Sequence, residues 1–397
     1  MHPLAIYANH NQGPIMILAN IEDYRRLAQR RLPRFLFEYI DGGAFGEATL
    51  RANTADLQTI RLRQRVLRDL SNLDTSTTLF GQKLSLPLIL APVGIAGLNA
   101  RRGEVQAARA AEQAGVPFCL STVSACALDE VRAGTQAPFW FQLYMMRDRG
   151  FLREILARAR ESGVETLLFT VDMPVPATRY RDIRSGLSGG SPVARKLRRV
   201  GQVLTRPRWA WDVGLMGRPH NLGNIAPVLG DRAGVDEFWT WMGKNFDPSV
   251  TWQDIDTIRA EWPGQFVIKG ILDPEDARQA ANLGADGLVV SNHGGRQLDG
   301  APSAISALPR IADTVKGELT LLMDSGIRSG LDLVRALALG ADAGMIGRPW
   351  VYGLAARGER GVSEVIALFE REIRVAMALT GSTRIADVGP EILWDAS

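Results

Sequence analysis

Polar residues that could take part in catalysis follow apolar runs of the chain, at the carboxyl end of each run. His293, one of four histidines, lies in SNHGGRQLDG, where two glycines and Arg296 follow it. A histidine in this setting can serve as a general base, although a lone histidine is equally often a hydrogen-bonded structural residue. Asp172 ends the run TLLFTVD and could orient the imidazole and stabilise its protonated form. The setting favours a proton-transferring His293–Asp172 pair.

Two arginines could bind an acidic substrate. A guanidinium holds a carboxylate through two parallel hydrogen bonds and stays charged at working pH. Arg296 lies three residues after His293, and Arg179 lies in the basic cluster RYRDIR. For Arg179, a solvated loop charge explains the composition equally well.

Lys269 ends the apolar run QFVIKG, where a buried ammonium group needs a partner. One interpretation is the Schiff-base lysine of a lyase or aldolase. The other is a cation beside an electron-rich ring that gains negative charge on reduction.

Two glycine-containing turns and one small-residue loop favour the second interpretation. DSGIR at 324–328 and GRP at 347–349 follow the last two apolar runs, where barrel enzymes commonly bind a phosphate. Arg328 and Arg348 would add positive charge there. The first run ends in APVGIAG, whose small side chains let a flat ring approach the backbone. The combination suits a phosphorylated aromatic cofactor.

Eight apolar runs must position these residues. They are nearly continuously apolar, as strands covered on both faces are, and amphipathic helical stretches ending in glycine separate them. The runs cover residues 86–92, 117–122, 139–145, 166–172, 265–270, 286–292, 319–326 and 343–349. This alternation predicts an α/β fold, a (β/α)8 TIM barrel with its site at the carboxyl ends of the strands. An open doubly wound sheet is disfavoured because no run is followed by G-x-G-x-x-G.

The domain organisation predicted is an irregular extension over residues 1–15 and a single cofactor-binding barrel domain over 16–397. Asn20 can cap a helix IEDYRRLAQRR with Asp23 in the reciprocal position, and Pro33 opens a second helix ending at Gly42-Gly43. These helices form an amino-terminal helical extension of the barrel.

A long loop, about 180–248, follows the fourth strand and carries many basic residues. Between residues 188 and 216, tryptophans and aliphatic residues accompany the charges. One interpretation is a solvated, mobile lid, and the other is a peripheral contact with an anionic membrane surface. The basic residues are Arg195, Lys196, Arg198, Arg199, Arg206, Arg208 and Arg218.

Composition excludes several other classes. The chain has 397 residues, 46% hydrophobic and 22% charged, with a formal net charge of +3. That charge is too small to indicate a nucleic-acid partner, and no apolar run approaches the ~18 residues of a membrane span. Cys119 and Cys126 lack metal-ligand spacing, so we expect no metal site. A cytoplasmic location is consistent with two cysteines and no secretory signal.

The motifs resemble those of the FMN-dependent alpha-hydroxy-acid dehydrogenase/oxidase family over about Ile21–Thr383. SNHGGRQLDG is the most specific, and WFQLY, TVD, VIKG, DSGIR and IGRP occur in the same order. FLFEYIDGGA and WAWDVGLMGRPHNLGNI look most like the bacterial respiratory L-lactate dehydrogenases of that family.

The resemblance implies a role for each candidate residue. His293 is the base and Asp172 its partner, while Lys269 neutralises charge at the flavin's N1–O2 edge. The implied substrate ligands are Tyr39, Tyr144, Arg179 and Arg296. The implied FMN ligands are Val93, Gly94, Ser121, Gln142, Thr170, Lys269, Ser291, Asp324, Gly326, Arg328, Gly347 and Arg348.

The activity implied is FMN-dependent oxidation of L-lactate to pyruvate, with electrons passed to a respiratory quinone or cytochrome. A peripheral location on the inner face of the cytoplasmic membrane and a homo-tetramer follow by resemblance. Mandelate is the alternative substrate, because Gly94 is glycine in both the mandelate and the bacterial lactate enzymes. Val123 replaces the tryptophan of glycolate oxidases, which disfavours glycolate. A Schiff-base lyase using Lys269 and a non-catalytic flavin- or phosphate-binding barrel are the alternatives outside this family.

Overall fold

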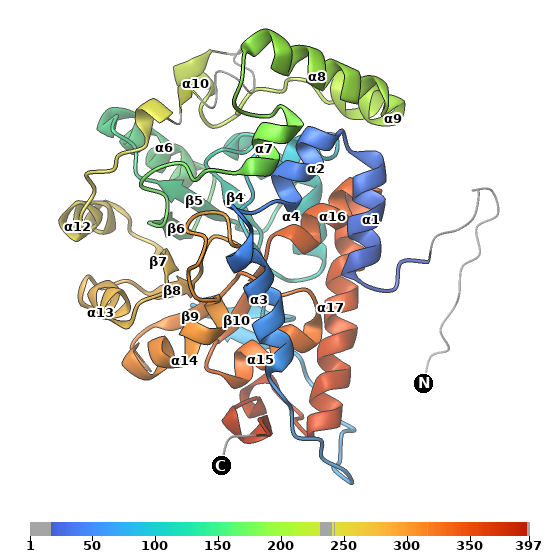
Figure 1. The fold of residues 1–397 in the computed structure, drawn as a ribbon. Helices are drawn as coiled ribbons and strands as arrows, with labels where there is room; N and C mark the ends of the chain where they lie inside the picture. Colours follow the sequence, from blue (N-terminus) through green and yellow to red (C-terminus); the bar gives the residue numbers. More distant parts are fainter. Residues whose placement is uncertain (1–16, 231–239, 242, 316, 395–397) are drawn as a thin grey trace.

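A computed structural model describes residues 17–230, 240–241, 243–315 and 317–394. Eight parallel strands form one sheet in the order β3-β10-β9-β8-β7-β6-β5-β4. A parallel bridge between Leu90 and Phe118 joins the two outer strands, so the sheet curls into a barrel (Figure 1). The strands are β3 (Leu88–Leu90), β4 (Cys119–Ser121), β5 (Trp140–Tyr144), β6 (Thr166–Thr170), β7 (Gln265–Ile271), β8 (Gly287–Val290), β9 (Thr320–Met323) and β10 (Ala343–Ile346). Seven of them lie within a predicted run and β7 extends one residue beyond its run, which confirms the (β/α)8 prediction.

Inward-facing side chains fill the barrel. Cys119 is 1% exposed and belongs to a buried cluster with residues from the other strands, as expected for a small apolar side chain. An antiparallel hairpin, β1 (Thr77–Leu79) and β2 (Gln82–Leu84), packs against this cluster, and its Phe80 ring lies 5.9 Å from Trp140 at the start of β5. The hairpin therefore closes the amino-terminal end, and the site forms at the other end.

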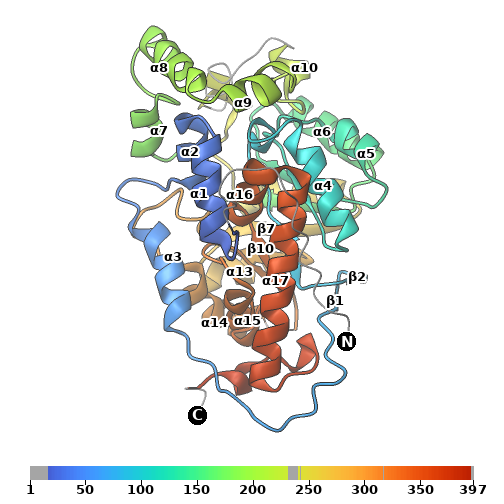
Figure 2. The ribbon, with the colours of Figure 1, turned by 90° about the vertical axis from the view of Figure 1, so that its right-hand side faces the viewer.

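Helices cover the outside of the barrel and connect successive strands. The helix α16 follows β10, and the long α17 packs against it (Figure 2). The covering helices are α4 (Gly103–Gln113), α5 (Leu128–Gly134), α6 (Arg149–Glu161), α12 (Trp252–Glu261), α13 (Pro274–Asn282), α14 (Ala304–Val315), α15 (Gly330–Ala338), α16 (Arg348–Arg357) and α17 (Glu359–Thr380). Short 3-10 helices are η1 (Ala96–Leu98), η3 (Ile385–Asp387) and η4 (Pro390–Ile392).

Three helices precede the barrel: α1 (Ile21–Arg31), α2 (Arg34–Asp41) and α3 (Ala48–Thr59). The Asn20 side chain accepts a hydrogen bond from the backbone N–H of Asp23, so the predicted cap is confirmed. The Asp23 carboxylate accepts from Ala19 rather than from Asn20. The helix α2 begins after Pro33 and ends at Gly42, as predicted, which brings Tyr39 to the barrel mouth. The predicted extension 1–15 lies outside the described residues.

The segment after β6 is largely helical where the sequence predicted a loop. It contains α7 (Tyr180–Ser185), α8 (Pro192–Leu204), α9 (Pro207–Trp209), the π-helix η2 (Ala210–Leu215) and α10 (Ala226–Leu229). Local signals explain α8, because Ser191 caps it and Pro192 occupies its first turn. Figures 1 and 2 both place α8 and α9 at one end of the molecule, beyond α2. Among the described helices, none combines the length and apolarity that crossing a bilayer requires.

Candidate active site

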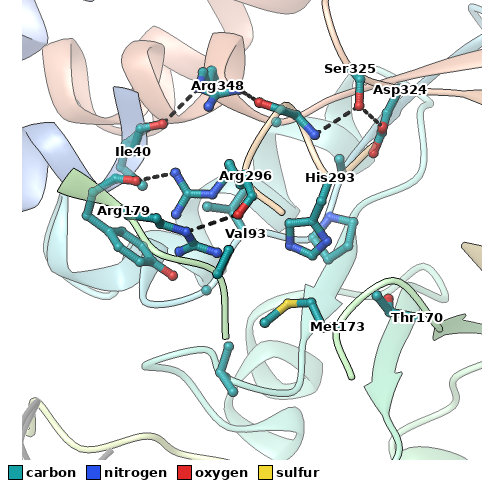
Figure 3. A pocket seen from close by; sticks show the side chains of 18 of the residues that line it. Ile40, Val93, Thr170, Met173, Arg179, His293, Arg296, Asp324, Ser325 and Arg348 are labelled. Atoms are coloured by element: carbon teal, nitrogen blue, oxygen red, sulfur yellow. Dashed lines mark hydrogen bonds between the residues drawn. The ribbon is translucent and has the colours of Figure 1, made fainter. Parts of the chain in front are cut away.

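A cavity opens at the carboxyl ends of the barrel strands (Figure 3). All the predicted site residues except Ser121, Asp172 and Ser291 line it. The predicted residues on its wall are Tyr39, Val93, Gly94, Gln142, Tyr144, Thr170, Arg179, Lys269, His293, Arg296, Asp324, Gly326, Arg328, Gly347 and Arg348. The remaining three lie directly behind residues of this wall.

His293 and Asp172 form the predicted pair. Nδ1 of His293 lies 2.8 Å from Oδ1 of Asp172, so Nε2 is the ring nitrogen left for a ligand in the cavity. Burial lowers the pKa of His293 below its usual value, although the Asp172 carboxylate opposes that shift. The imidazole is therefore neutral at neutral pH and can accept a proton, and the carboxylate can stabilise the imidazolium that results.

Lys269 is 4% exposed, and its ammonium group has two partners. Nζ lies 2.7 Å from Oδ2 of Asp324 and donates to the Ser291 hydroxyl, also at 2.7 Å. Burial alone would lower the pKa of Lys269, but the Asp324 and Asp172 carboxylates outweigh it and raise the pKa. Lys269 is thus a fixed cation at the cavity wall, which suits charge neutralisation and disfavours a nucleophilic amine.

A hydrogen-bonded chain crosses three neighbouring strands beneath the cavity. The Ser121 hydroxyl donates to the Gln142 side-chain oxygen at 3.1 Å, and the Gln142 amide donates to the Thr170 hydroxyl at 3.0 Å. Ser121 lies behind the wall and orients Gln142, whose amide faces the cavity. The chain therefore presents polar groups with fixed orientation on β4, β5 and β6.

Arg179 and Arg296 lie together, as predicted for a carboxylate clamp. Nε of Arg179 donates to the backbone oxygen of Arg296 at 3.3 Å. Burial, reinforced by the positive charge of Arg296, lowers the pKa of Arg179 to about 10. Two guanidinium groups that repel each other in a buried site would be stabilised by a bound carboxylate.

Both predicted tyrosines border this region. The Arg296 guanidinium stacks over the Tyr39 ring at 4.9 Å and donates to the backbone oxygens of Tyr39 and Gly42 at 2.5 and 2.8 Å. Burial, and secondarily the Asp172 charge, raises the pKa of Tyr144, so its phenol stays protonated and can donate a hydrogen bond.

The loops after β9 and β10 contain Gly326, Arg328, Gly347 and Arg348. Arg348 donates to the backbone oxygens of Ile40, Gly294 and Gly42 at 2.9, 3.0 and 2.8 Å (Figure 3). It therefore ties α2 to the loop of His293, a structural role that the sequence did not predict. Burial, together with the charge of Arg328, lowers the pKa of Arg348 to about 9, so a bound anion would be stabilised at this end of the cavity.

Val93 and Gly94, in the loop after β3, form part of the cavity wall. A Cβ on Gly94 would lie 2.8 Å from Cγ2 of Val123 and 2.9 Å from the Tyr39 hydroxyl, so glycine is required for these two side chains to pack against the backbone here. A wall without a side chain at Gly94, a buried cation at one edge and two arginines at the loops after β9 and β10 fit the ring, the reducible edge and the phosphate of FMN.

Sequence reasoning missed several residues of the cavity wall. Asp182 is 3% exposed and lies 4.0 Å from Arg179, and the three-residue spacing between Asp182 on α7 and Arg179 just before this helix would have indicated the ion pair. Met173 and Ile183 also line the wall. Ser325 has φ of 67°, and its hydroxyl accepts from the backbone N–H of Gly294 at 2.9 Å. Nothing in the sequence distinguishes Met173 or Ile183 from loop residues, whereas Ser325 lies within the DSGIR turn that the sequence did indicate.

A (β/α)8 barrel with a buried histidine–aspartate pair, a fixed lysine and arginines at its last two loops has the architecture of a flavin-dependent oxidoreductase. The family model described as FMN-dependent dehydrogenase matches residues 28–395. The chain belongs to this family, and FMN is its cofactor.

Two relatives and one solved structure illustrate the similarity. The chain is 60% identical to an L-lactate dehydrogenase of Stenotrophomonas maltophilia (strain R551-3), over 95% of this chain and 99% of the relative. It is also 60% identical to an L-lactate dehydrogenase of Caulobacter vibrioides (strain NA1000 / CB15N), over 95% and 98%. A solved monotopic membrane protein, (S)-mandelate dehydrogenase, matches with a TM-score of 0.88 at 35% identity, covering 95% of this chain and 99% of that one.

Proposed function

We propose that this enzyme oxidises L-lactate to pyruvate and passes the electrons to a respiratory quinone or cytochrome. The observation that carries the proposal is the placement of a buried arginine pair on the same cavity as the His293–Asp172 pair. A substrate that offers a carboxylate to the first pair and a proton near the second is a 2-hydroxy acid. The two L-lactate dehydrogenases at 60% identity support lactate as that acid.

In the proposed mechanism, Arg179 and Arg296 hold the substrate carboxylate, and Tyr39 and Tyr144 donate hydrogen bonds to the substrate. Nε2 of His293 accepts a proton, either from C2 or from the hydroxyl group. Asp172 keeps the imidazole oriented and stabilises its protonated form. Bound FMN supplies the acceptor for the two electrons that leave C2.

The remaining proposed roles concern FMN binding. Lys269, fixed by Asp324, balances negative charge near the flavin ring, and Ser291 holds Lys269 in turn. Val93 and Gly94 border the ring, while Ser121, Gln142 and Thr170 fix its polar edge. Ser291 was predicted as an FMN ligand, but its position behind the wall favours an indirect role. The proposed phosphate and ribityl ligands are Asp324, Gly326, Arg328, Gly347 and Arg348.

Mandelate is the second candidate substrate. Gly94 and the small Val123 both line the cavity, and the (S)-mandelate dehydrogenase shares the fold closely. Steady-state turnover of L-lactate and L-mandelate distinguishes them. A kcat/KM for L-lactate at least tenfold above that for L-mandelate is expected, and the reverse ratio would assign the enzyme to mandelate.

We further propose that the helix α8 binds an anionic membrane surface. Every residue of α8 is exposed or half-buried. Val193, Leu197, Val200 and Leu204 recur at helical spacing on one stripe, with exposed fractions of 70, 68, 49 and 75%. Exposed basic side chains such as Lys196 accompany this stripe. An apolar stripe with basic neighbours is the pattern of a helix that lies in the membrane interface.

Neighbouring residues extend this surface. Trp211, Leu215 and Met216 on and after η2 are 65, 46 and 46% exposed. The Trp209 indole instead donates to the backbone oxygen of Leu98 at 2.9 Å, which fastens the segment to the loop after β3. Each basic residue near an anionic surface contributes about 1 kcal/mol. Together these features favour membrane contact over a mobile solvated lid.

The cavity opens beside the same segment. Ile183 on α7 lines the cavity and is 45% exposed, so its side chain reaches from the wall to the surface, nine residues before α8 begins. We therefore propose that a membrane-dissolved quinone reaches the cavity from this side. This supports a peripheral location on the inner face of the cytoplasmic membrane. By family resemblance, we also propose a homo-tetramer, which light scattering can measure.

Vesicle sedimentation tests the membrane proposal. The enzyme should bind anionic vesicles at low salt, and binding should weaken with added salt and be small on neutral vesicles. Leu197→Ser should reduce binding, while Leu67→Ser, at a leucine outside the segment that is even more exposed, should not. The reduced enzyme should transfer electrons to a short-chain quinone much faster than to oxygen. Indifference to anionic vesicles, or equal effects of the two substitutions, would leave the solvated-lid interpretation.

A further inference from the structure

The backbone of the loop that carries His293 is held in a strained conformation. His293 has φ of 58°, and Gly294 and Gly295 follow with φ of 69° and 70°. Glycine adopts these values freely, but a residue with a side chain does so at a cost. Contacts from the surroundings must therefore hold His293 in the left-handed region.

Two buried asparagines supply such contacts. Asn53 on α3 is 1% exposed and Asn292 is 5% exposed. Asn53 Nδ2 donates to Asn292 Oδ1 at 2.8 Å, and Asn292 Nδ2 donates to Asn53 Oδ1 at 2.7 Å. Asn292 Oδ1 also accepts from the backbone N–H of Gly295 at 2.9 Å. The pair thus joins α3 to both ends of the turn that contains His293.

Asn53 also contacts the loop after β9. A Cβ on Gly326 would lie 2.1 Å from the backbone oxygen of Asn53, so the two backbones pack directly. Ser325, in the same loop, accepts from the backbone N–H groups of Asn292 and Gly294 at 3.3 and 2.9 Å. Asn53 therefore lies where the loop of His293 and the predicted phosphate loop meet.

We infer that Asn53 is a positioning residue for His293, acting through Asn292. The exchanged amide bonds fix the left-handed turn, and the turn keeps Nδ1 of the imidazole on Asp172 and Nε2 toward the cavity. Without them the turn can relax, because a right-handed backbone is the more stable one for a non-glycine residue. The inference rests on the proposed role of His293 as the base.

Other contacts between α3 and this loop offer a matched control. The Thr49 hydroxyl donates to the backbone oxygen of Ala301 at 3.2 Å and accepts from the N–H of Gly300 at 2.8 Å. These bonds join the same helix to the same loop, but beyond the turn of His293. Thr49→Val removes these hydrogen bonds with little change in side-chain volume. It therefore weakens the contact between α3 and the loop at residues 300–301 but leaves the Asn53–Asn292 pair intact.

The experiment compares Asn53→Ala, Thr49→Val and His293→Gln in the FMN-loaded enzyme. It measures FMN content, the Kd of pyruvate from the flavin spectrum, and the rate of anaerobic flavin reduction by L-lactate. Asn53→Ala should slow reduction about 100-fold, the effect of a displacement of about 1 Å, and change the Kd of pyruvate less than threefold. Thr49→Val should reduce flavin within twofold of the unmodified rate. The double variant Asn53→Ala/Asn292→Ala should reduce flavin no more slowly than the slower of the two single variants, because each substitution alone already breaks the same Asn53–Asn292 hydrogen bonds.

A reduction rate for Asn53→Ala within threefold of the unmodified rate would overturn the inference, and so would an equal slowing by Thr49→Val. If Asn53→Ala does not retain FMN, Asn53→Asp at pH 8 provides the test. The aspartate side chain keeps the volume of asparagine but has no N–H to donate to Asn292. This variant too should slow flavin reduction at least tenfold. If His293→Gln still reduces flavin normally, the proposed function fails first. If His293→Gln is inactive while Asn53→Ala is fast, only the positioning role fails.

Discussion

Replacing Asp172 by asparagine removes the charge beside His293 while keeping the size of the side chain. The 2.8 Å contact between Nδ1 and Oδ1 places the two charge centres about 4 Å apart. At an effective dielectric constant of about 20, unit charges at that separation interact by roughly 4 kcal/mol. His293 is charged only after it has accepted the proton, so this stabilisation acts on the transition state. Since 1.36 kcal/mol is a factor of ten, we expect Asp172→Asn to slow flavin reduction about 10³-fold.

Anaerobic stopped-flow reduction of the FMN enzyme by L-lactate measures this effect. FMN content and the Kd of pyruvate serve as controls, because the substituted residue lies behind the cavity wall rather than on it. A reduction rate within tenfold of the unmodified enzyme would refute the electrostatic reasoning. It would show that Asp172 serves only to hold the ring in place.

The same substitution has a predicted pH signature. The pKa of His293 already lies below its ordinary 6.5, because burial outweighs the opposing effect of Asp172. The neutral imidazole is the active form, so kcat/KM should fall as the pH drops through that lowered pKa. Loss of the Asp172 charge removes an effect that raises the pKa, so the acidic limb should move to still lower pH. A limb that moves toward higher pH would contradict this assignment.

Further substitutions test the rest of the cavity. Arg296→Lys should lower kcat and raise KM for L-lactate in steady-state assays, because it keeps the charge but loses the planar fork and the stacking on Tyr39. Arg179→Met should raise KM more than it lowers kcat, and unchanged inhibition by 2-oxo acids in both variants would count against the clamp. Gly94→Ala should lower kcat/KM about tenfold, the effect of a sub-ångström displacement of Tyr39, and adding Val123→Ala should recover part of that loss. A chain beginning at Met16 should bind FMN and turn over normally, and apoprotein from it would assign a role to the extension.

The barrel and most of the cavity could be predicted because their signals are local. Each strand is a continuous apolar run, and the residue types at the ends of those runs revealed the rim of the barrel. The amino-terminal hairpin was missed because its strands are three residues long, too short for any periodicity. The helix α8 was missed although its signals are local: Ser191 and Pro192 mark its start, and its apolar residues recur at helical spacing. The prediction of a loop rested on the charges and tryptophans of this segment and not on these signals.

The helix α3 could not be predicted from the sequence for a different reason. Its buried positions are Thr49, Asn53 and Leu57, so two of the three side chains that face the barrel are polar. An apolar pattern cannot identify such a helix, because its contacts are hydrogen bonds to loops far away in the sequence. Asn53 reaches Asn292 across 239 residues of chain. The groups that hold the predicted base in place were therefore hidden, although the base itself was not.

The pKa values of three cations on the cavity wall differ with the charges of their neighbours. The pKa of buried Lys269 is raised because Asp324 balances its charge. Arg179 and Arg348 each face another arginine instead, and burial lowers their pKa values to about 10 and 9. Positive charge is thus concentrated at two separate regions of one cavity, beside the His293–Asp172 pair, where Asp182 lies 4.0 Å from Arg179, and at the loops after β9 and β10. In the proposed function a substrate carboxylate and a cofactor phosphate bind at these two regions. A neutral alcohol would bring no negative charge to the first region, so we expect the arginine pair to favour a 2-hydroxy acid over a neutral alcohol.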